Sequence, residues 1–282
     1  MIAAALPHFP VVVGRGRLGA ALEKALRKAG LDPRSAGGRE SRERPEDLLR
    51  LLRGNGRTPV LLLAVRDDAL APLAAGLAAV VPAATAGAAA LHLSGALGPE
   101  VLRPLAARGF ATAACHPLQT FTGSPVDAAR FAGAGFAVEG SEEGRAAAEA
   151  LVRALGGRPF SISSDARPLY HLAASLGANG LTGLVAAARD ALAATGVGPE
   201  AAIAALAPLL RTALHEALRS GPEAALTGPV SRGDETTVER HRRALLAWDE
   251  SRAALFEALL EEQRRLSGHG AWSPDAKMPR SE

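Results

Sequence analysis

The chain has 282 residues, of which 48% are hydrophobic and only 4% aromatic, and its formal net charge is +3. This length suits two modest domains, and the composition predicts a core built from Ala, Leu and Val. The small, dispersed charge gives no reason to expect nucleic acid or a membrane as partner. Cys115 is the single cysteine and excludes an intrachain disulfide. Because no signal peptide and no uninterrupted apolar run of membrane-spanning length are expected, the sequence predicts a soluble cytoplasmic protein.

The stretch from Val11 to Leu22 reads VVVGRGRLGAAL. It predicts a buried strand, a G-x-G-x-x-G turn and a helix, the order found in dinucleotide-binding sites. Gly14 would permit the tight turn, Gly16 would let the backbone approach a pyrophosphate, and Gly19 would let the helix pack closely on the sheet. The alternative is a glycine-rich turn without a ligand. The predicted cofactor-binding residues of this turn are Gly14, Arg15, Gly16, Arg17, Leu18 and Gly19.

Strands and helices alternate through the first half of the chain. Strands are expected at 11–14, 32–35, 59–65, 89–93, 111–115, 135–139 and 158–163, and helices at 18–29, 46–53, 69–80, 99–108 and 142–155. After Asp165 the pattern is helical, at 169–195, at 199–220 as one or two helices, and at 235–266. Such alternation predicts an α/β fold with an N-terminal Rossmann, doubly wound parallel sheet. The domains are placed at 1–164 (nucleotide-binding), 165–266 (all-helical) and 267–282 (flexible tail).

The segment after the second strand bears on which dinucleotide binds. NAD sites place an acidic residue there for the ribose 2′-hydroxyl. Here Arg39, Ser41 and Arg42 supply two planar donors and a hydroxyl, which suit a 2′-phosphate, and Glu40 is the contrary residue. The sequence therefore favours NADP over NAD, with a solvated charged loop as the alternative.

Three further loops follow parallel strands, and they should converge at the carboxyl edge of the sheet. They read Val65-Arg66-Asp67-Asp68, His92-Leu93-Ser94-Gly95 and His116-Pro117-Leu118-Gln119-Thr120-Phe121. Asp67 or Asp68 could contact the cofactor or cap the next helix. A structural hydrogen bond is as plausible as catalysis for His92 and His116. The predicted cofactor contacts in these loops are Val65, Asp67, Ser94, Gly95, His116 and Pro117.

In the helix that starts the second half, His171, Ser175 and Asn179 recur every four residues and therefore share one face. A polar stripe on an otherwise apolar helix must meet water, a partner or a ligand. It predicts either a substrate wall or hydrogen bonding between helices. Further on, the segment from Thr227 to Asp234 could cap the last long helix and bring donors, Arg232 above all, to a carboxylate; the alternative is a polar turn between helices.

The segments VVVGRGRLG, HLSGALGPEVL, CHPLQTF, YHLAASLGANGL and ALTGPVSRGD, in this order, resemble the bacterial proteins that combine a Rossmann-like domain with domain of unknown function 2520. More distantly the chain is similar to pyrroline-5-carboxylate reductase, ketopantoate reductase and the β-hydroxyacid dehydrogenases. The resemblance implies a helical domain like that of 6-phosphogluconate dehydrogenase and a homodimer formed through it. It implies an NADP-dependent oxidoreductase that reduces a C=O or C=N bond of a small carboxylate, without a metal.

One departure concerns the proton donor. In the hydroxyacid and ketopantoate enzymes a lysine lies four residues before an asparagine, whereas Ser175 takes that place before Asn179. His171 is then the first candidate acid and His116 the second. Ser175 and Asn179 would orient the substrate, and Thr227 and Arg232 would bind its carboxylate. The alternatives are an NADP-binding regulatory or redox-sensing protein without turnover, and a helical dimerisation protein with a vestigial Rossmann domain.

Overall fold

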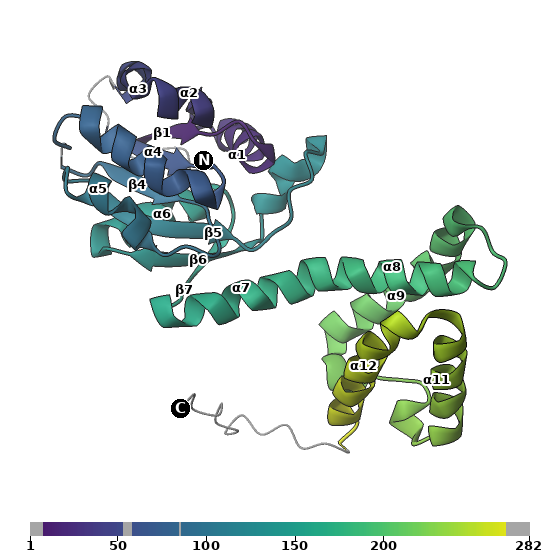
Figure 1. Cartoon of the computed structure of the whole chain (residues 1–282). Helices are drawn as coiled ribbons and strands as arrows, with labels where there is room; N and C mark the ends of the chain where they lie inside the picture. Colours follow the sequence, from purple (N-terminus) through teal and green to yellow (C-terminus); the bar gives the residue numbers. More distant parts are fainter. Residues whose placement is uncertain (1–7, 53–57, 85, 269–282) are drawn as a thin grey trace. The chain divides into compact units, whose positions relative to one another are not determined.

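The structure is a computed structural model that describes residues 8–52, 58–84 and 86–268. The chain divides into two compact units, one up to Gly180 and one from Leu181 onward (Figure 1). The division falls after residue 164, the predicted end of the first domain. The first helix beyond the sheet belongs to the first unit, because its Arg167 forms an ion pair with Glu139 of the sheet.

The first unit is built on a sheet of seven strands within the described residues. Its order is β2-β1-β3-β4-β5-β6-β7. The strands are β1 (His8–Val13), β2 (Arg34–Ala36), β3 (Thr58–Leu63), β4 (Ala89–His92), β5 (Ala111–Pro117), β6 (Gly135–Gly140) and β7 (Arg158–Ser161). β2 lies on one side of β1 and all later strands lie on the other, so the strand order changes direction at β1, as in the doubly wound arrangement that the sequence predicted.

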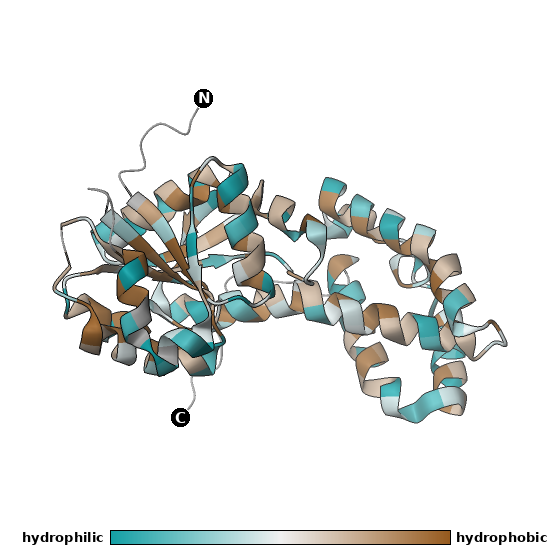
Figure 2. Ribbon diagram, turned by 90° about the horizontal axis from the view of Figure 1, so that it is seen from above, coloured by the Kyte–Doolittle hydropathy of each residue, from teal (hydrophilic) through white to brown (hydrophobic). Residues whose placement is uncertain are grey.

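Helices cover both faces of the sheet. They are α1 (Arg17–Lys28), α2 (Gly38–Glu43), α3 (Pro45–Leu52), α4 (Asp67–Val80), α5 (Arg103–Ala106) and α6 (Glu142–Ala154). Val12 and Leu62 belong to the buried cluster that includes α1 and α6, whereas Val11 and Leu61 belong to the cluster that includes α3, α4 and α5. Successive strand residues thus face opposite layers, and the inner strands β3 and β4 are mostly hydrophobic (Figure 2). Burial of one such Val or Leu contributes about 1.5–3 kcal/mol.

The sheet departs from the prediction in one pair, because β6 runs antiparallel to β5. The connection between them begins and ends at the same edge, where the Leu118 N–H donates to the Gly135 carbonyl at 2.8 Å. A parallel crossover would need a helix across the sheet. The short 3₁₀ helix of this connection, Pro125–Phe131, instead packs against α1. The chain therefore returns on the same edge, and the sheet is mostly parallel.

The helical segment after the sheet begins with α7 (Arg167–Ser175), continues through a π-helical turn (Leu176–Gly180) and leads into α8 (Leu181–Ala193). The sequence predicted one α-helix over 169–195. A π turn takes up an extra residue per turn. Asn179 is therefore rotated away from the position that a regular α-helix would give it beneath His171 and Ser175.

The second unit is helical over its described residues, as predicted. After α8 it comprises α9 (Pro199–Ser220), α10 (Pro222–Ala225), α11 (Glu235–Asp249) and α12 (Ala253–Leu266). The segment 199–220 is one helix with Pro208 inside it. By length and composition α9 is also apolar enough to cross a membrane, a weak indication that the expectation from sequence did not include.

The prediction of one helix over 235–266 was wrong. Asp249 leaves helical geometry at φ −157°, and its carboxylate accepts a hydrogen bond from the Ser251 N–H at 3.1 Å. This Asx-type cap starts the turn Glu250–Arg252 and so separates α11 from α12. Arg242 of α11 pairs with Glu257 of α12, and Arg264 of α12 pairs with Glu235 of α11, so the two helices form an antiparallel hairpin.

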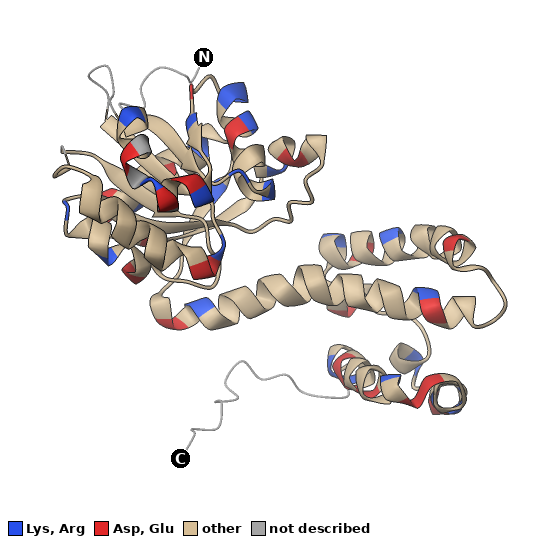
Figure 3. Ribbon diagram, turned by 45° about the horizontal axis from the view of Figure 1, so that its top comes forward, with Lys and Arg blue, Asp and Glu red and all other residues tan. Residues whose placement is uncertain are grey.

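Charged side chains of both signs occur along the helices of each unit (Figure 3). Many form pairs one helical turn apart, such as Glu149 with Arg153 and Glu239 with Arg243. Exposed pairs of this kind contribute little to the free energy of unfolding, because water screens them. Their intermixed distribution agrees with the small net charge.

Candidate functional site

The glycine turn lies between β1 and α1, and its three glycines meet different surroundings. Gly14 has φ +122°, and a Cβ there would lie 2.2 Å from the Ala64 carbonyl oxygen. A Cβ on Gly19 would lie 2.0 Å from the Gly14 carbonyl oxygen. A Cβ on Gly16 would meet no described atom within 4 Å. The fold itself therefore requires Gly14 and Gly19, whereas Gly16 leaves its backbone open for a ligand.

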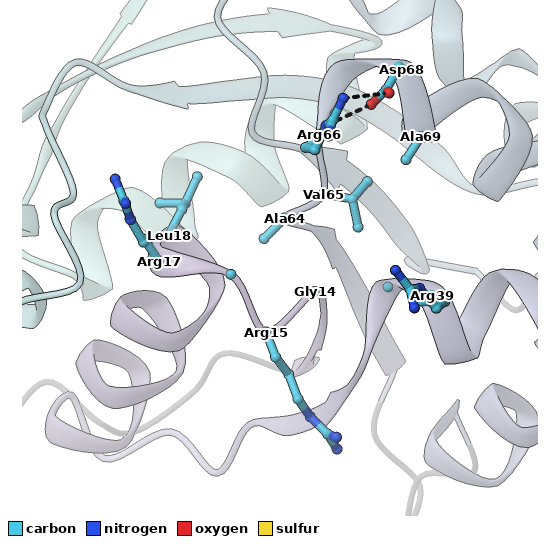
Figure 4. Close-up of a pocket in the computed structure, with 12 residues that line it drawn as sticks. Gly14, Arg15, Arg17, Leu18, Arg39, Ala64, Val65, Arg66, Asp68 and Ala69 are labelled. Atoms are coloured by element: carbon cyan, nitrogen blue, oxygen red, sulfur yellow. Dashed lines mark hydrogen bonds and ion pairs between the residues drawn. The ribbon is translucent and has the colours of Figure 1, made fainter.

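A cavity of about 530 Å³ opens beside this turn (Figure 4). Its volume falls in the range of small-molecule and cofactor sites. The N-terminus of α1 lies at the cavity, where backbone N–H groups and the helix dipole favour an anion. The lining comes from the glycine turn with the start of α1, the start of α2, the loop after β3 and the first turn of α4: Gly14, Arg15, Gly16, Arg17, Leu18, Gly38, Arg39, Ala64, Val65, Arg66, Asp68 and Ala69.

The segment predicted to hold a 2′-phosphate is the short helix α2 and not a loop. Arg39 is exposed and lines the cavity. The Glu40 carboxylate accepts from the Gly37 N–H at 3.3 Å and lies 3.6 Å from Arg15, so it is engaged by its own helix N-terminus and by a cation. Ser41 is buried, and its Oγ has no hydrogen-bond partner among the described residues. The side chain of Arg42 lies outside the described part of the structure.

At the end of β3, Asp67 and Asp68 occupy the first turn of α4, whose N-cap residue is Arg66. Neither acidic side chain caps the helix by a hydrogen bond. Asp68 instead pairs with Arg66 at 2.8 Å. Both carboxylates lie in the first turn of the helix, where the helix dipole favours negative charge. The side-chain cap that the sequence suggested for Asp67 or Asp68 is therefore not formed.

His92 at the end of β4 has a structural position. It is fully buried, its Nδ1 accepts from the Ser94 N–H at 3.2 Å, and its Nε2 bonds the Gly98 carbonyl at 2.9 Å. Burial lowers the pKa of His92 to about 4, so the ring is neutral at neutral pH. Ser94 accepts from the backbone N–H groups of Ala96 and Leu97. These bonds give the loop after β4 a fixed shape and place Gly95 at the edge of the sheet.

The structure brings His116 and His171 together, although they lie 55 residues apart in the sequence. Their ring centroids lie 6.4 Å apart. A Cβ on Gly95 would lie 2.9 Å from Nε2 of His116 and 2.9 Å from Nδ1 of His171, so both nitrogens approach one point above Gly95. His116 is half-buried and His171 is exposed. Burial, with His171 and Arg167 nearby, lowers the pKa of His116 to about 4.

Four residues that sequence reasoning did not place in the site adjoin this cluster, namely Tyr170, Arg167, Glu139 and Ser164. The Tyr170 hydroxyl lies 2.5 Å from Nδ1 of His116. Arg167 is buried and donates from Nε and Nη2 to Oε2 of Glu139 on β6, at 2.9 and 2.5 Å. Ser164 donates to the other oxygen of Glu139. Arg167 also donates to the Gly95 carbonyl at 3.4 Å. A buried, hydrogen-bonded ion pair thus ties α7 to the sheet.

A signal for Tyr170 existed, since it is the only tyrosine of the chain and adjoins His171. No comparable signal marked Arg167, because its partner Glu139 lies in a different element. Ser175 ends α7, and Asn179 lies in the π-helical turn. Thr227 and Arg232 are exposed residues of the second unit. There Asp234 caps α11 by accepting from the Thr237 N–H at 3.0 Å, so the capping part of the prediction for this segment is confirmed.

Family comparisons agree with the two-part organisation. Residues 9–117 match the model of a Rossmann-like domain, and residues 134–263 match that of domain of unknown function 2520 (DUF2520). The chain therefore joins a Rossmann-like domain to a DUF2520 domain, which confirms the resemblance drawn from its motifs. Among curated proteins none matches the sequence.

Solved structures share the fold over nearly the whole chain. A Thermotoga maritima protein is 22% identical with a TM-score of 0.69, over 92% of this chain and 98% of that one. A candidate NADP oxidoreductase from Bacteroides fragilis is 25% identical with a TM-score of 0.68, over 93% and 100%. Plasmodium falciparum pyrroline carboxylate reductase with NADP bound is 12% identical with a TM-score of 0.57, over 93% and 98%.

Proposed function

We propose that this protein is an NADP-dependent oxidoreductase that reduces a C=O or C=N bond of a small carboxylate. The observation that carries the proposal is the cavity at the α1 N-terminus, where Gly16 is open to a ligand and arginine side chains surround the turn. The NADP named for two similar structures supports the choice of cofactor. Arg39 at the cavity and the engaged carboxylate of Glu40 favour NADP over NAD.

In this proposal the backbone of the turn from Gly14 to Gly19 holds the pyrophosphate, and Arg39 holds the 2′-phosphate. Ser41 and Arg42 remain secondary candidates, because the Ser41 hydroxyl is buried. Val65 and Asp67 border the nucleotide at the end of β3. Strands lie about 4.8 Å apart, so β5 is about 10 Å from β3 along the edge. Ser94, Gly95, His116 and Pro117 are therefore assigned to the nicotinamide end.

NADPH, when bound, supplies a hydride, and the protein supplies position and a proton. As the new C–H bond forms, the π electrons of the C=O or C=N bond move to oxygen or nitrogen. That atom takes a proton from His171, which is exposed and can be reprotonated from solvent. Ser175 is assigned to orient the substrate, whereas Asn179, which the π-helical turn rotates away from the face of His171, is given no role. Thr227 and Arg232 of the second unit are the proposed donors to the substrate carboxylate.

Replacement of His171 tests the assigned acid. The His171→Ala variant should slow single-turnover oxidation of NADPH by about 10²–10⁴-fold with a substrate that the wild type reduces. The control is His241→Ala, which alters an exposed histidine of α11. A decrease of less than about tenfold would exclude His171 as the general acid.

The second candidate function is an NADP-binding regulatory or redox-sensing protein. It is favoured by Ser175, which stands where related carbonyl reductases have a lysine. Binding of NADPH without its consumption, over a panel of 2-keto acids and cyclic imines, would favour this function over catalysis.

We also propose a homodimer formed through the helical unit. Large apolar side chains of α9 are exposed in the single chain, among them Leu209, Leu214 and Leu218 at 65%, 45% and 80%. Exposed apolar surface of this extent marks an interaction site. Arg211, Glu216 and Arg219 interrupt the same helix, which favours a second protein copy over lipid as the occupant.

A further inference from the structure

The starting observation is the contact between Tyr170 and His116, which the proposed reaction does not use. The Tyr170 hydroxyl approaches Nδ1 of His116 at 2.5 Å, and the two rings meet edge-on with centroids 5.6 Å apart. Phe160 packs edge-on against the other side of Tyr170 at 6.1 Å. The phenol is thus held between two rings, and its oxygen is directed at one particular nitrogen.

Both partners of this contact are neutral. Burial raises the pKa of Tyr170 to about 12 and lowers that of His116 to about 4. Between a neutral phenol and a neutral imidazole, the imidazole nitrogen is the better acceptor and the phenol the better donor. The hydrogen bond therefore runs from the Tyr170 O–H to Nδ1, which leaves the single ring proton of His116 on Nε2.

The other nitrogen of His116 faces the point above Gly95 that Nδ1 of His171 also approaches, each at 2.9 Å from the Cβ position of that glycine. Gly95 has a fixed position. Its carbonyl accepts a hydrogen bond from Arg167, and hydrogen bonds of His92 and Ser94 hold the loop that contains it. Because both nitrogens lie within 2.9 Å of one point, they are close enough together for one polar ligand atom, farther from the Gly95 Cα than that point, to contact both.

We infer that Tyr170 is a positioning residue that fixes the Nε2–H tautomer of His116, so that His116 donates a hydrogen bond to the carbonyl oxygen or imine nitrogen undergoing reduction. The inference rests on the proposed reductase function. His116 loses no proton in this scheme, since the proton transferred comes from His171. A neutral imidazole held as a donor stabilises the charge that develops on the acceptor atom.

Ring-nitrogen NMR of the full-length ¹⁵N-labelled chain tests the inference without any substrate. Long-range ¹H–¹⁵N spectra at pH 7 should show His116, assigned by its loss in His116→Gln, with a protonated Nε2 and an unprotonated Nδ1. In Tyr170→Phe, which keeps the ring between Phe160 and His116, the same residue should show a mixture of tautomers. A wild-type spectrum with the proton on Nδ1, or with both tautomers, overturns the inference even if the variant does not fold.

Single-turnover kinetics distinguish a positioning role of Tyr170 from a purely structural one. Tyr170→Phe should lower the single-turnover rate by about tenfold in the wild-type background and by less than about twofold in the His116→Gln background, because its effect passes through His116. Equal losses in both backgrounds contradict the inference. If the wild type shows the fixed tautomer but reduces no substrate, the proposed function fails while the role of Tyr170 stands.

Discussion

Gly16 is the glycine of the turn that ligand binding, and not the fold, explains. Its neighbours Gly14 and Gly19 are required by contacts with Ala64 and with each other. Gly16 has φ −69°, which any residue adopts, and its Cβ direction is empty. Since the folded chain would accept a side chain at this position, the close approach of a pyrophosphate to the backbone explains why a glycine is found here.

A Gly16→Ala substitution should therefore separate binding from stability. We expect the Kd for NADPH, measured by nicotinamide fluorescence, to rise at least about tenfold, because a methyl group would stand between backbone and phosphate. The urea midpoint should change little, since loss of a glycine N-cap costs about 1 kcal/mol or less. Gly76→Ala on α4, also with no atom within 4 Å, is the control. Unchanged affinity in Gly16→Ala would contradict the assigned pyrophosphate site.

His92 gives a pH-dependent stability of predictable sign. Its pKa is about 4 in the folded chain against 6.5 in a model peptide, so the unfolded chain binds more protons between these values. The contribution of neutral His92 is complete above pH 6.5 and is lost as the pH falls toward 4, by up to about 3 kcal/mol.

Hydrogen exchange in β4 and β5 should report this effect. Protection should fall between pH 6.5 and 4, after correction for intrinsic exchange, and this fall should be smaller in His92→Gln. His116 titrates in the same window, so part of the dependence should remain. His241→Gln, on an exposed site, should keep the full dependence. An identical pH dependence in His92→Gln and wild type would show that His92 is not buried in its neutral form.

At the scale of the element, hydrophobic patterning located the strands and most helices, but it did not reveal local interruptions. The break at Asp249 depends on one carboxylate that accepts from the Ser251 N–H, and the π turn at 176–180 leaves the apolar pattern unchanged. The helix α2 was missed because Gly37, Gly38 and charged residues read as a loop. Glu40 bonds the Gly37 N–H and so stabilises its start.

The helix α9 carries the prediction for assembly. The wild type should have the mass of two 28.8 kDa chains in light scattering, because the apolar side chains of α9 need a partner. Leu214→Glu with Leu218→Glu, which places two charges on one face, should give the monomer. Thr212→Glu adds one carboxylate at an exposed polar position and should leave the dimer intact, whereas Leu214→Glu alone should already weaken it. A wild type that stays monomeric at about 100 µM, a concentration at which obligate dimers persist, would contradict the dimer.

At the scale of the whole molecule, the sequence predicted the Rossmann sheet, the helical second part and the glycine turn, because each rests on local patterns. The reversal of β6 was not predictable from patterning, since parallel and antiparallel strands of this length look alike. The sequence did predict that the loops of Gly95 and His116 converge, but not that Tyr170 and His171 join them, because that approach depends on tertiary contacts of α7. The buried pair of Arg167 and Glu139 places α7 on the sheet, and with it two of these residues.

The central claim is that the chain reduces a small substrate with NADPH. The most direct measurement is single-turnover oxidation of NADPH, followed by absorbance, with enzyme in excess over cofactor and a panel of 2-keto acids and cyclic imines. The account predicts consumption of NADPH with at least one panel member, and faster consumption than of NADH. Tight binding of NADPH with no consumption across the panel would contradict it and would leave the regulatory function in its place.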